Sequence, residues 1–187
     1  MQRREFDLLV PTGHVDLGVR PAKWSELPKV FEIAKKDIPA LSAAFPYVEG
    51  AINRNSESIL VFHRNEEIVG VYAMLLLSAS GLERLLVGEL DTSAPDTDAI
   101  VRSGEEPSAI YNWAVVAHRL ASEGFRHASV YLRQPRFQRA NIYARGTTPA
   151  ACRIMEHTGY QLLGGHYTDL YRYVRLENRQ SRLPLAA

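Results

Sequence analysis

The sequence has almost no excess of charge of either sign. Its 187 residues include 22 lysines and arginines and 21 aspartates and glutamates, which gives a net charge of +1. A protein that binds nucleic acid or an anionic membrane through its overall field carries a clear basic excess. The composition therefore predicts neither nucleic acid nor a membrane as a partner.

Cysteine and long apolar runs are also scarce. Cys152 is the only cysteine, so no disulfide framework forms within the chain, and this is typical of a reducing compartment. The longest apolar run, Ile68 to Leu77, contains a glycine and is far shorter than the ~20 residues that span a bilayer. Phe6 to Val10 is too short for the core of a signal peptide. We therefore expect a cytoplasmic protein.

Two kinds of catalytic centre are missing from the sequence patterns. The histidines show no pair at metal-ligand spacing such as His-x-x-x-His, so no metal site is expected. There is no Gly-x-Ser-x-Gly elbow and no phosphate loop of the nucleotide-hydrolase kind. Cys152 has no histidine beside it and is predicted to be a small packed residue rather than a nucleophile.

The length and the 46% hydrophobic content fit one domain with its own core. We place this domain at residues 15–176. Residues 1–14 form an N-terminal segment, and residues 177–187 form a C-terminal tail.

Strand and helix signals alternate in the first half of the chain. Residues 15–23 alternate apolar and polar side chains, which predicts a strand. Ser25 fits the N-cap of a first helix, and a second, interrupted helix is predicted over residues 40–52. Two apolar runs then flank the polar turn at residues 64–66, which is typical of a hairpin. Residues 83–91 are predicted to be a third strand of this meander.

The second half begins with the strongest helical spacing. Residues 107–123 place apolar side chains on one stripe, including Trp113 as a core residue, with Gly124 as the stop. Residues 127–134 are predicted to be a strand, and residues 135–146 a loop. Four arginines in and just before this loop either clamp phosphates or an acidic substrate, or form a solvated surface: Arg133, Arg136, Arg139 and Arg145.

A last helix is predicted between Thr148 and Gly159. Thr148 fits the N-cap, Pro149 the first helical position and Gly159 the C-terminal stop. The runs "YQLLGG" and "DLYRYVRLE" follow as two strands. The predicted class is therefore α/β (α+β), with a mixed central sheet flanked by helices.

Two stretches of this sequence resemble the GCN5-related N-acetyltransferase (GNAT) family. "GVRPAKWSELPKVFEIA" is similar to the family's opening strand, its Arg-Pro-Ala-like turn and its first helix. The last helix matches the family's spacing of Asn, Ala, Leu-Tyr and Gly-Phe, and the corresponding residues here are Thr148, Ala151, Ile154, Met155, Gly159 and Tyr160. The resemblance covers about residues 15 to 176 in element order.

The resemblance implies an acyl-CoA N-acyltransferase fold that uses acetyl-CoA. In that fold two parallel central strands splay apart and hydrogen-bond the pantetheine arm, while the N-terminus of the central helix binds the pyrophosphate. Here that helix is the one predicted to begin near Pro107. The implied cofactor-binding residues are Arg102, Gly104, Ser108, Ala109 and Thr148.

The implied reaction is acetyl transfer to a primary amine by direct attack, without a covalent enzyme intermediate. Glu89 lies where the family often has its carboxylate base. Met155 occupies the position of the family's proton-donating tyrosine, and a thioether cannot donate a proton. Tyr143 is therefore the candidate donor to the departing thiolate.

The same departures from the family pattern support an alternative function. The phosphate loop is altered as well, because Gly104 in "RSGEEPSA" is out of register. A catalytically silent ligand-binding or protein-interaction module with this fold is the alternative to the enzyme. For the enzyme, the resemblance implies a small-molecule or peptide amine as acceptor, and pairing into homodimers is common in the family.

Overall fold

The computed structural model describes residues 5–13, 16–38, 45–117 and 120–180. Its helices are α1 (Leu27–Lys35), α2 (Phe45–Arg54), α3 (Ala79–Val87), α4 (Ala121–Tyr131), α5 (Pro149–His157) and α6 (Leu176–Gln180). Its strands are β1 (Gly18–Pro21), β2 (Ile59–Arg64), β3 (Glu67–Leu77), β4 (Ala109–Val116), β5 (Asn141–Arg145), β6 (Gln161–Leu162) and β7 (Leu170–Tyr173). No helix within these described ranges is long and apolar enough to cross a membrane.

The strands form one mixed sheet in the order β1-β2-β3-β4-β5-β7-β6. All neighbours are antiparallel except β4 and β5, which are parallel. The predicted hairpin is confirmed as β2 and β3. Its turn residues Asn65 and Glu66 have φ of 47° and 67°, the left-handed conformation that tight hairpin turns adopt.

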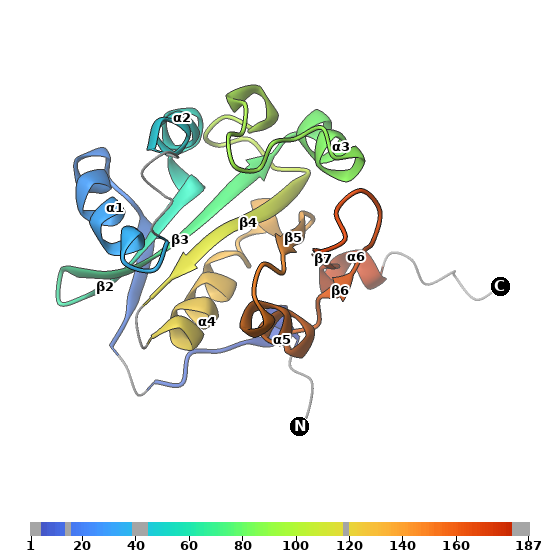
Figure 1. Cartoon of the computed structure of the whole chain (residues 1–187). Helices are drawn as coiled ribbons and strands as arrows, with labels where there is room; N and C mark the ends of the chain where they lie inside the picture. The colour runs from blue at the N-terminus through green and yellow to red at the C-terminus, as the bar shows by residue number, and fades with distance from the viewer. Residues whose placement is uncertain (1–4, 14–15, 39–44, 118–119, 181–187) are drawn as a thin grey trace.

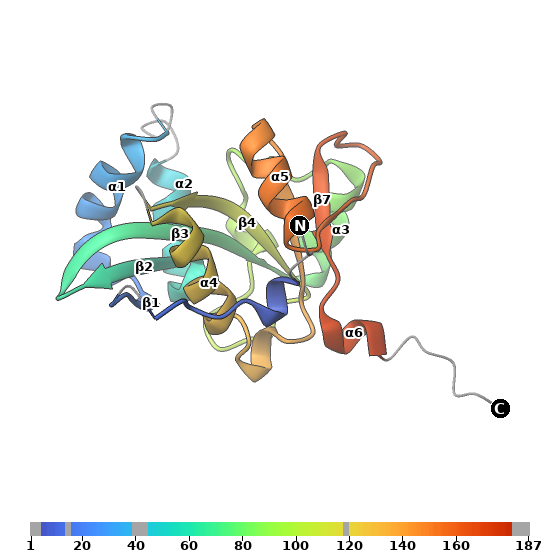
Figure 2. The same cartoon turned by 90° about the horizontal axis from the view of Figure 1, so that it is seen from below.

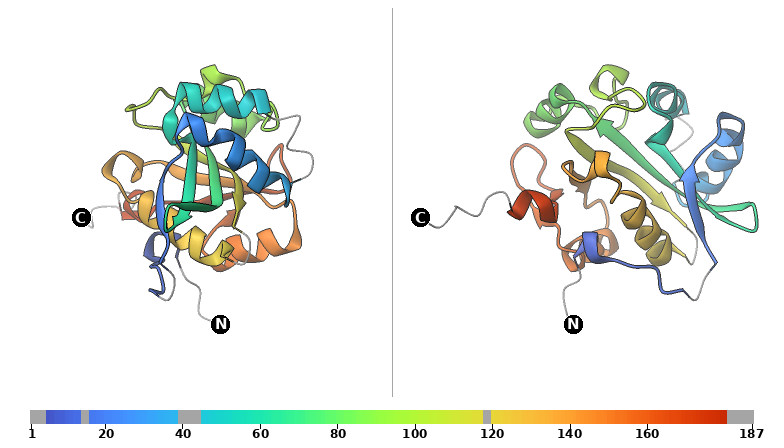
Figure 3. Two further views of the ribbon diagram at one scale, coloured as in Figure 1. Left: turned by 90° about the vertical axis from the view of Figure 1, so that its left-hand side faces the viewer. Right: turned by 180° about the vertical axis from the view of Figure 1, so that it is seen from behind.

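Helices cover both faces of the sheet (Figures 1 and 2). On one face, α1 and α2 pack against β2 and β3 around Phe31, Ile52 and Val71. Beside them, Leu85 of α3 packs over Leu75 and Tyr111. On the other face, α4 and α5 cover a second core; its buried members include Phe6, Phe62, Met74, Ile110, Ala128, Met155 and Tyr160. Figure 3 shows the same two layers from the side and from behind.

The predicted helix over residues 107–123 is wrong, because residues 109–116 form β4. This strand lies in the middle of the sheet, with Tyr111 in the core beneath α3 and Ile110 in the core beneath α4 and α5. A strand that is covered on both faces is apolar at nearly every position, so helical and extended spacings fit it equally well. The aromatic and β-branched residues of "AIYNWAVV" favour the strand.

The predictions on either side of β4 are also wrong. Residues 83–91, predicted to be a strand, fall mainly in α3, which is capped by Ser78 through a hydrogen bond from Gly81 N and ends at Gly88 with φ of 79°. Residues 127–134, predicted to be a strand, fall mainly in α4. Gly124, predicted as a stop, lies inside α4, and a Cβ there would lie 2.8 Å from the ring of Phe62. This glycine lets the helix approach the sheet closely.

The helix from Thr148 to Gly159 is confirmed as α5. The Thr148 side chain accepts a hydrogen bond from Ala151 N at 3.1 Å, and Pro149 opens the helix. Gly159 follows the helix with φ of 93°, which is the left-handed C-terminal conformation that favours glycine. Part of the predicted loop over residues 135–146 is β5. Part of the predicted second helix, residues 40–44, lies outside the described residues, and the rest falls in α2.

Candidate active site

β4 and β5 pair over only part of their length. Their parallel ladder ends where Asn112 lies opposite Ala144. β4 continues to Val116, but β5 ends at Arg145 and the chain turns into α5. Figure 1 shows the two strands diverging toward their carboxyl ends. Within the described residues, the β5-facing edge of residues 113–116 has no strand partner, and we call this opening the fork.

The fork begins at a β-bulge in β4. On its other edge β4 pairs with β3, and the register shifts there, because Ala73 lies opposite Ala114 but Met74 lies opposite Asn112. Trp113 is the extra residue, and both Trp113 and Ala114 pack against the core beneath α1 and α2. A bulge bends its strand and increases the local twist. The bulge therefore turns β4 away from β5 at the place where their pairing stops.

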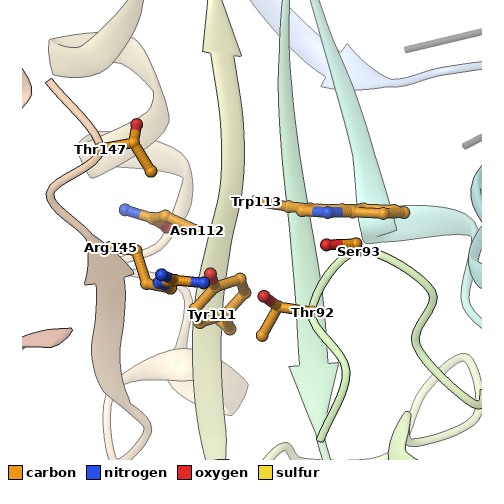
Figure 4. Close-up of a pocket in the computed structure, with 7 residues that line it drawn as sticks. All are labelled: Thr92, Ser93, Tyr111, Asn112, Trp113, Arg145 and Thr147. Carbon is orange, nitrogen blue, oxygen red and sulfur yellow. The ribbon is translucent and has the colours of Figure 1, made fainter. Parts of the chain in front are cut away.

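A cavity of about 220 Å³ lies where the two strands part. Figure 4 shows Asn112 on the β5 side of β4, with Arg145 and Thr147 facing it, and Ser93 and Trp113 on the opposite side. The lining side chains belong to Thr92, Ser93, Tyr111, Asn112, Trp113, Arg145 and Thr147. The cavity is thus polar, aromatic on one side, and positively charged at one point.

Arg145 is held in one orientation at the edge of this cavity. Its Nε donates to both carboxylate oxygens of Asp169, at 2.9 and 3.1 Å. Its guanidinium carbon lies 4.9 Å from the centre of the Tyr167 ring, and the Tyr167 hydroxyl donates to Leu90 O at 2.8 Å. The hydrogen bond with Asp169 raises the pKa of Arg145. The guanidinium is therefore a fixed and permanent cation.

Two tyrosines lie side by side in the ladder below the fork. Tyr111 of β4 is opposite Tyr143 of β5, and both side chains are buried in the core beneath α3. Burial raises the pKa of each phenol, so at neutral pH both are protonated and can donate a proton. Tyr111 lines the cavity, whereas Tyr143 has Arg172 as its polar neighbour.

Asn112, the last paired residue before the fork, is fixed from the other face of the sheet. The hydroxyl of Tyr72 donates to its Oδ1, and its Nδ2 donates to the Tyr160 hydroxyl at 3.1 Å. Both tyrosines are fully buried, and burial raises the pKa of both phenols. The network satisfies the amide and holds the strand in place at the bulge.

Comparisons of the structure with solved structures identify one fold. A GNAT-family acetyltransferase from Listeria monocytogenes matches with a TM-score of 0.56 and 13% identity, over 86% of this chain and 95% of that one. A GNAT-family acetyltransferase from Streptococcus agalactiae matches with a TM-score of 0.54 and 9% identity, over 89% and 98%. The structure titled histone acetyltransferase HPA2 and related acetyltransferase, from Corynebacterium glutamicum, matches with a TM-score of 0.51 and 17% identity, over 86% and 97%.

The chain has the GNAT acetyltransferase fold. The predicted resemblance and the predicted fold class are both confirmed by these matches. No family model matches the sequence, and a comparison with curated proteins gives no match. The similarity to the GNAT structures therefore lies in the arrangement of the elements.

Most of the predicted cofactor residues lie at the end of β4 that is far from the fork. Residues 102–108 form a turn before the strand that is exposed except at Pro107. Ser108 N donates to Leu77 O at 2.8 Å, and Ala109 is the first residue of β4. Ala109 lies four residues before Trp113, the first residue of the fork, which is about 13 Å along a strand. Because the helix expected at Pro107 does not exist, the reason for assigning CoA to Arg102, Gly104, Ser108 and Ala109 is lost, and their role stays an untested prediction.

Three further residues singled out in the sequence, Thr148, Glu89 and Met155, do not line the cavity. Thr148 caps α5 and directly follows Thr147, which lines the cavity. Glu89 is exposed in the loop after α3, three residues before Thr92 of the lining, so the loop reaches the cavity but Glu89 does not line it. Met155 is buried in the core beneath α5. The base role of Glu89 and the donor role of Tyr143 stay predictions.

The sequence prediction missed three lining residues that sit in or beside the ladder: Tyr111, Asn112 and Trp113. A strand assignment for residues 109–116 would have placed them next to the diverging strands. Arg145 was named in the sequence only as one of four arginines that either clamp phosphates or an acidic substrate or form a solvated surface, and of these four the cavity lining includes Arg145. Among the described residues, no three His, Cys, Asp or Glu side chains lie close enough together to hold a metal ion.

Proposed function

We propose that this protein is an acyl-CoA-dependent N-acyltransferase, most simply an acetyltransferase of the cytoplasm that acts on a small primary amine. The observation that supports the proposal is the fork: a parallel pair that ends at Asn112 and opens directly into a polar cavity. Residues 113–115 are half-buried and have no strand partner on this edge, so their peptide groups need water or a ligand as hydrogen-bond partners. An amide-containing pantetheine arm laid along residues 113–116 supplies them, as an added strand would.

The start of α4 is our candidate site for the pyrophosphate. α4 begins at Ala121, five residues after β4 ends at the open side of the fork, with Leu120 at its N-cap position and no side chain capping it. The N–H groups of a first helical turn bind anions. Glu123 lies in this turn, but its carboxylate accepts hydrogen bonds from Thr12 N at 2.8 Å and Thr12 Oγ1 at 3.2 Å, and lies 3.7 Å from Arg126 Nε. These contacts compensate its charge.

The chemistry requires few groups from the protein. Acetyl-CoA would supply an acyl group already activated as a thioester. The nitrogen of the neutral amine forms the new bond to the acyl carbon, the carbon–sulfur bond breaks, the nitrogen loses a proton to a base, and the sulfur gains one. Tyr111 carries a protonated hydroxyl in the cavity and is our candidate donor beside Tyr143. Glu89 stays the candidate base, reached through water from its loop.

Met155 supports a second candidate function. It is buried at the position where the resemblance predicts a tyrosine donor, and no carboxylate lines the cavity. A protein that binds a CoA ester, or another ligand, without catalysing transfer would tolerate both features. This module keeps the fork but needs no proton donor.

Calorimetric titration with acetyl-CoA and with free CoA tests the proposal. Binding in the micromolar range, followed by release of free thiol in the presence of primary amines, supports the enzyme. Binding without thiol release across a broad amine panel supports the module. Absence of heat and of any thermal shift with either compound would exclude CoA chemistry at the fork.

A further inference from the structure

The charge in the cavity is carried by one residue. Arg145 is the charged member of the lining, which otherwise consists of threonine, serine, asparagine and aromatic side chains. No carboxylate is present there to receive a second positive charge. An acceptor with several amines, such as a polyamine, would bring further cations to a cavity whose lining carries a guanidinium and no carboxylate.

The guanidinium of Arg145 also has donors left over. Its Nε is bound to Asp169, and within the described part of the chain neither Nη1 nor Nη2 donates a hydrogen bond. The side chain is 35% exposed, so a ligand can reach it. A guanidinium has more than one edge, and a second carboxylate can bind the Nη atoms while the first keeps Nε.

The supporting residues make this cation suitable for recognition. Asp169 and the ring of Tyr167 fix the plane of the guanidinium, so little side-chain entropy is lost when a ligand binds. Arg145 also follows Ala144, the residue opposite Asn112, where the fork begins. A group bound to Arg145 is therefore held beside the position where the thioester would lie.

We propose that Arg145 binds a carboxylate of the substrate, so that one of the two reactants is itself a carboxylic acid. This inference rests on the proposed function. The carboxylate belongs either to the acceptor, as in an α-amino acid, or to the acyl chain, as in a dicarboxylic acyl-CoA. Thr92, Tyr111 and Thr147 add neutral hydroxyls around it. The volume of about 220 Å³ is below the range for drug-sized ligands, so the reactant is small.

The experiment measures binding first, so that it remains informative for an inactive protein. The full chain, saturated with free CoA, is titrated with single amino acids and with the matching amino acid amides, for example L-alanine against L-alaninamide. In a second arm, the protein alone is titrated with succinyl-CoA and with butyryl-CoA, which have the same acyl chain length. We expect a preference for the carboxylate of about 30-fold in one arm, as a charge-assisted bidentate contact gives.

Substitutions then connect the preference to Arg145. In Arg145→Gln the preference falls below about threefold, whereas Arg145→Lys keeps part of it, because lysine has the charge but not the fork of donors. Arg64→Gln, an exposed arginine in the β2–β3 hairpin, removes the same charge far from the cavity and leaves the preference unchanged. Arg64→Gln also keeps the acetyl-CoA affinity of the unchanged protein within about twofold, and thermal unfolding confirms that each of the three variants is folded.

The outcomes separate this inference from the proposed function. If acetyl-CoA binds but carboxylates and amides bind equally, or if Arg145→Gln keeps the preference, the carboxylate site is refuted while the acyltransferase proposal stands. If acetyl-CoA does not bind, the proposed function fails, and titration of the amino acid pairs against the protein alone still tests Arg145. The arm that shows the preference identifies which reactant carries the carboxylate.

Discussion

The two edges of β4 differ sharply, although they belong to the same eight residues. Along the edge that faces β3, antiparallel pairing runs from Ala109 to Val116 and is interrupted only by the bulge at Trp113. Along the edge that faces β5, pairing stops at Asn112. The edge that faces β3 is paired along the strand, whereas the edge that faces β5 leaves the peptide groups of residues 113–116 for a ligand.

This difference shows how a stable sheet can contain a binding site. The β3 edge supplies the hydrogen bonds and the packing that keep β4 in place, so the β5 edge can remain open without loss of the strand. The bulge connects the two edges, because the residue inserted opposite β3 is also the first residue of the fork. We call the edge of β4 that pairs with β3 the closed edge, and the β5-facing edge of residues 113–116 the open edge. Changes on the closed edge should therefore affect folding, and changes on the open edge should affect binding and chemistry.

The largest effect is expected from crowding the closed edge. A Cβ on Gly70 would lie 2.7 Å from Val116 O and 2.8 Å from Ala117 Cβ, and a backbone oxygen cannot move aside easily. Gly70→Val should lower the free energy of unfolding by about 3 kcal/mol, measured by urea denaturation. Glu67→Val introduces valine at an exposed position of β3 and should change the free energy of unfolding by less than about 0.5 kcal/mol. Equal stability of the two variants would contradict the close packing.

The next effect concerns catalysis at the open edge. If the Tyr111 hydroxyl protonates the leaving sulfur, Tyr111→Phe should lower kcat about 100-fold with unchanged acetyl-CoA affinity. Tyr143→Phe removes a buried hydroxyl from the neighbouring strand, outside the cavity lining, and should leave kcat within about threefold. If Tyr143→Phe loses activity and Tyr111→Phe does not, Tyr143 is the donor. If both variants keep their activity, water protonates the sulfur.

The amide network at the bulge gives a smaller effect on stability. Asn112→Leu leaves the buried hydroxyls of Tyr72 and Tyr160 without their amide partner and should cost about 2 kcal/mol. The triple variant Tyr72→Phe, Asn112→Leu, Tyr160→Phe removes every member and should recover most of this loss, because no polar group is then left unsatisfied. Denaturant titrations of both variants measure the difference, and a triple variant less stable than the single one would count against the network.

The smallest effect lies far from the fork, at the edge strand β1. Arg20 donates to both oxygens of Glu26, at 2.8 and 2.6 Å, and this contact lowers the pKa of Glu26 from 4.5 to about 2. Because the folded-state pKa is the lower one, the stabilisation is present above pH 4.5 and is lost as the pH falls toward 2. Glu26→Gln should cost less than about 1 kcal/mol at pH 7 and nothing near pH 2.

A cost for Glu26→Gln that grows toward acid pH would contradict this assignment. Activity provides the control, since Arg20 and Glu26 lie outside the cavity lining. The variant should keep the kcat and the acetyl-CoA affinity of the unchanged protein.

The elements with local signals could be predicted from the sequence. α5 has a capping threonine, a proline at its first position and a glycine at its end, and each of these acts within one turn of the chain. The β2–β3 hairpin has a two-residue turn between alternating runs. Both were predicted correctly because their determinants lie next to each other in the sequence.

The central part of the fold could not be predicted in this way. β4 is a strand because β3 and β5 lie on either side of it, and these partners are not adjacent to it in the sequence. α4 tolerates Gly124 because Phe62, on β2, occupies the space of the missing side chain. The cavity combines residues from a loop, from β4 and from the end of β5, so its composition became known only from the tertiary structure.

The contact between Thr12 and Glu123 has a practical consequence for experiments. It brings the amino-terminal region of the polypeptide to the first turn of α4, beside the position proposed for the pyrophosphate. A protein shortened past Thr12 would lose both hydrogen bonds to Glu123 and leave its carboxylate less compensated beside the bound anion. Titrations should therefore use protein that keeps Thr12 and its contacts with Glu123.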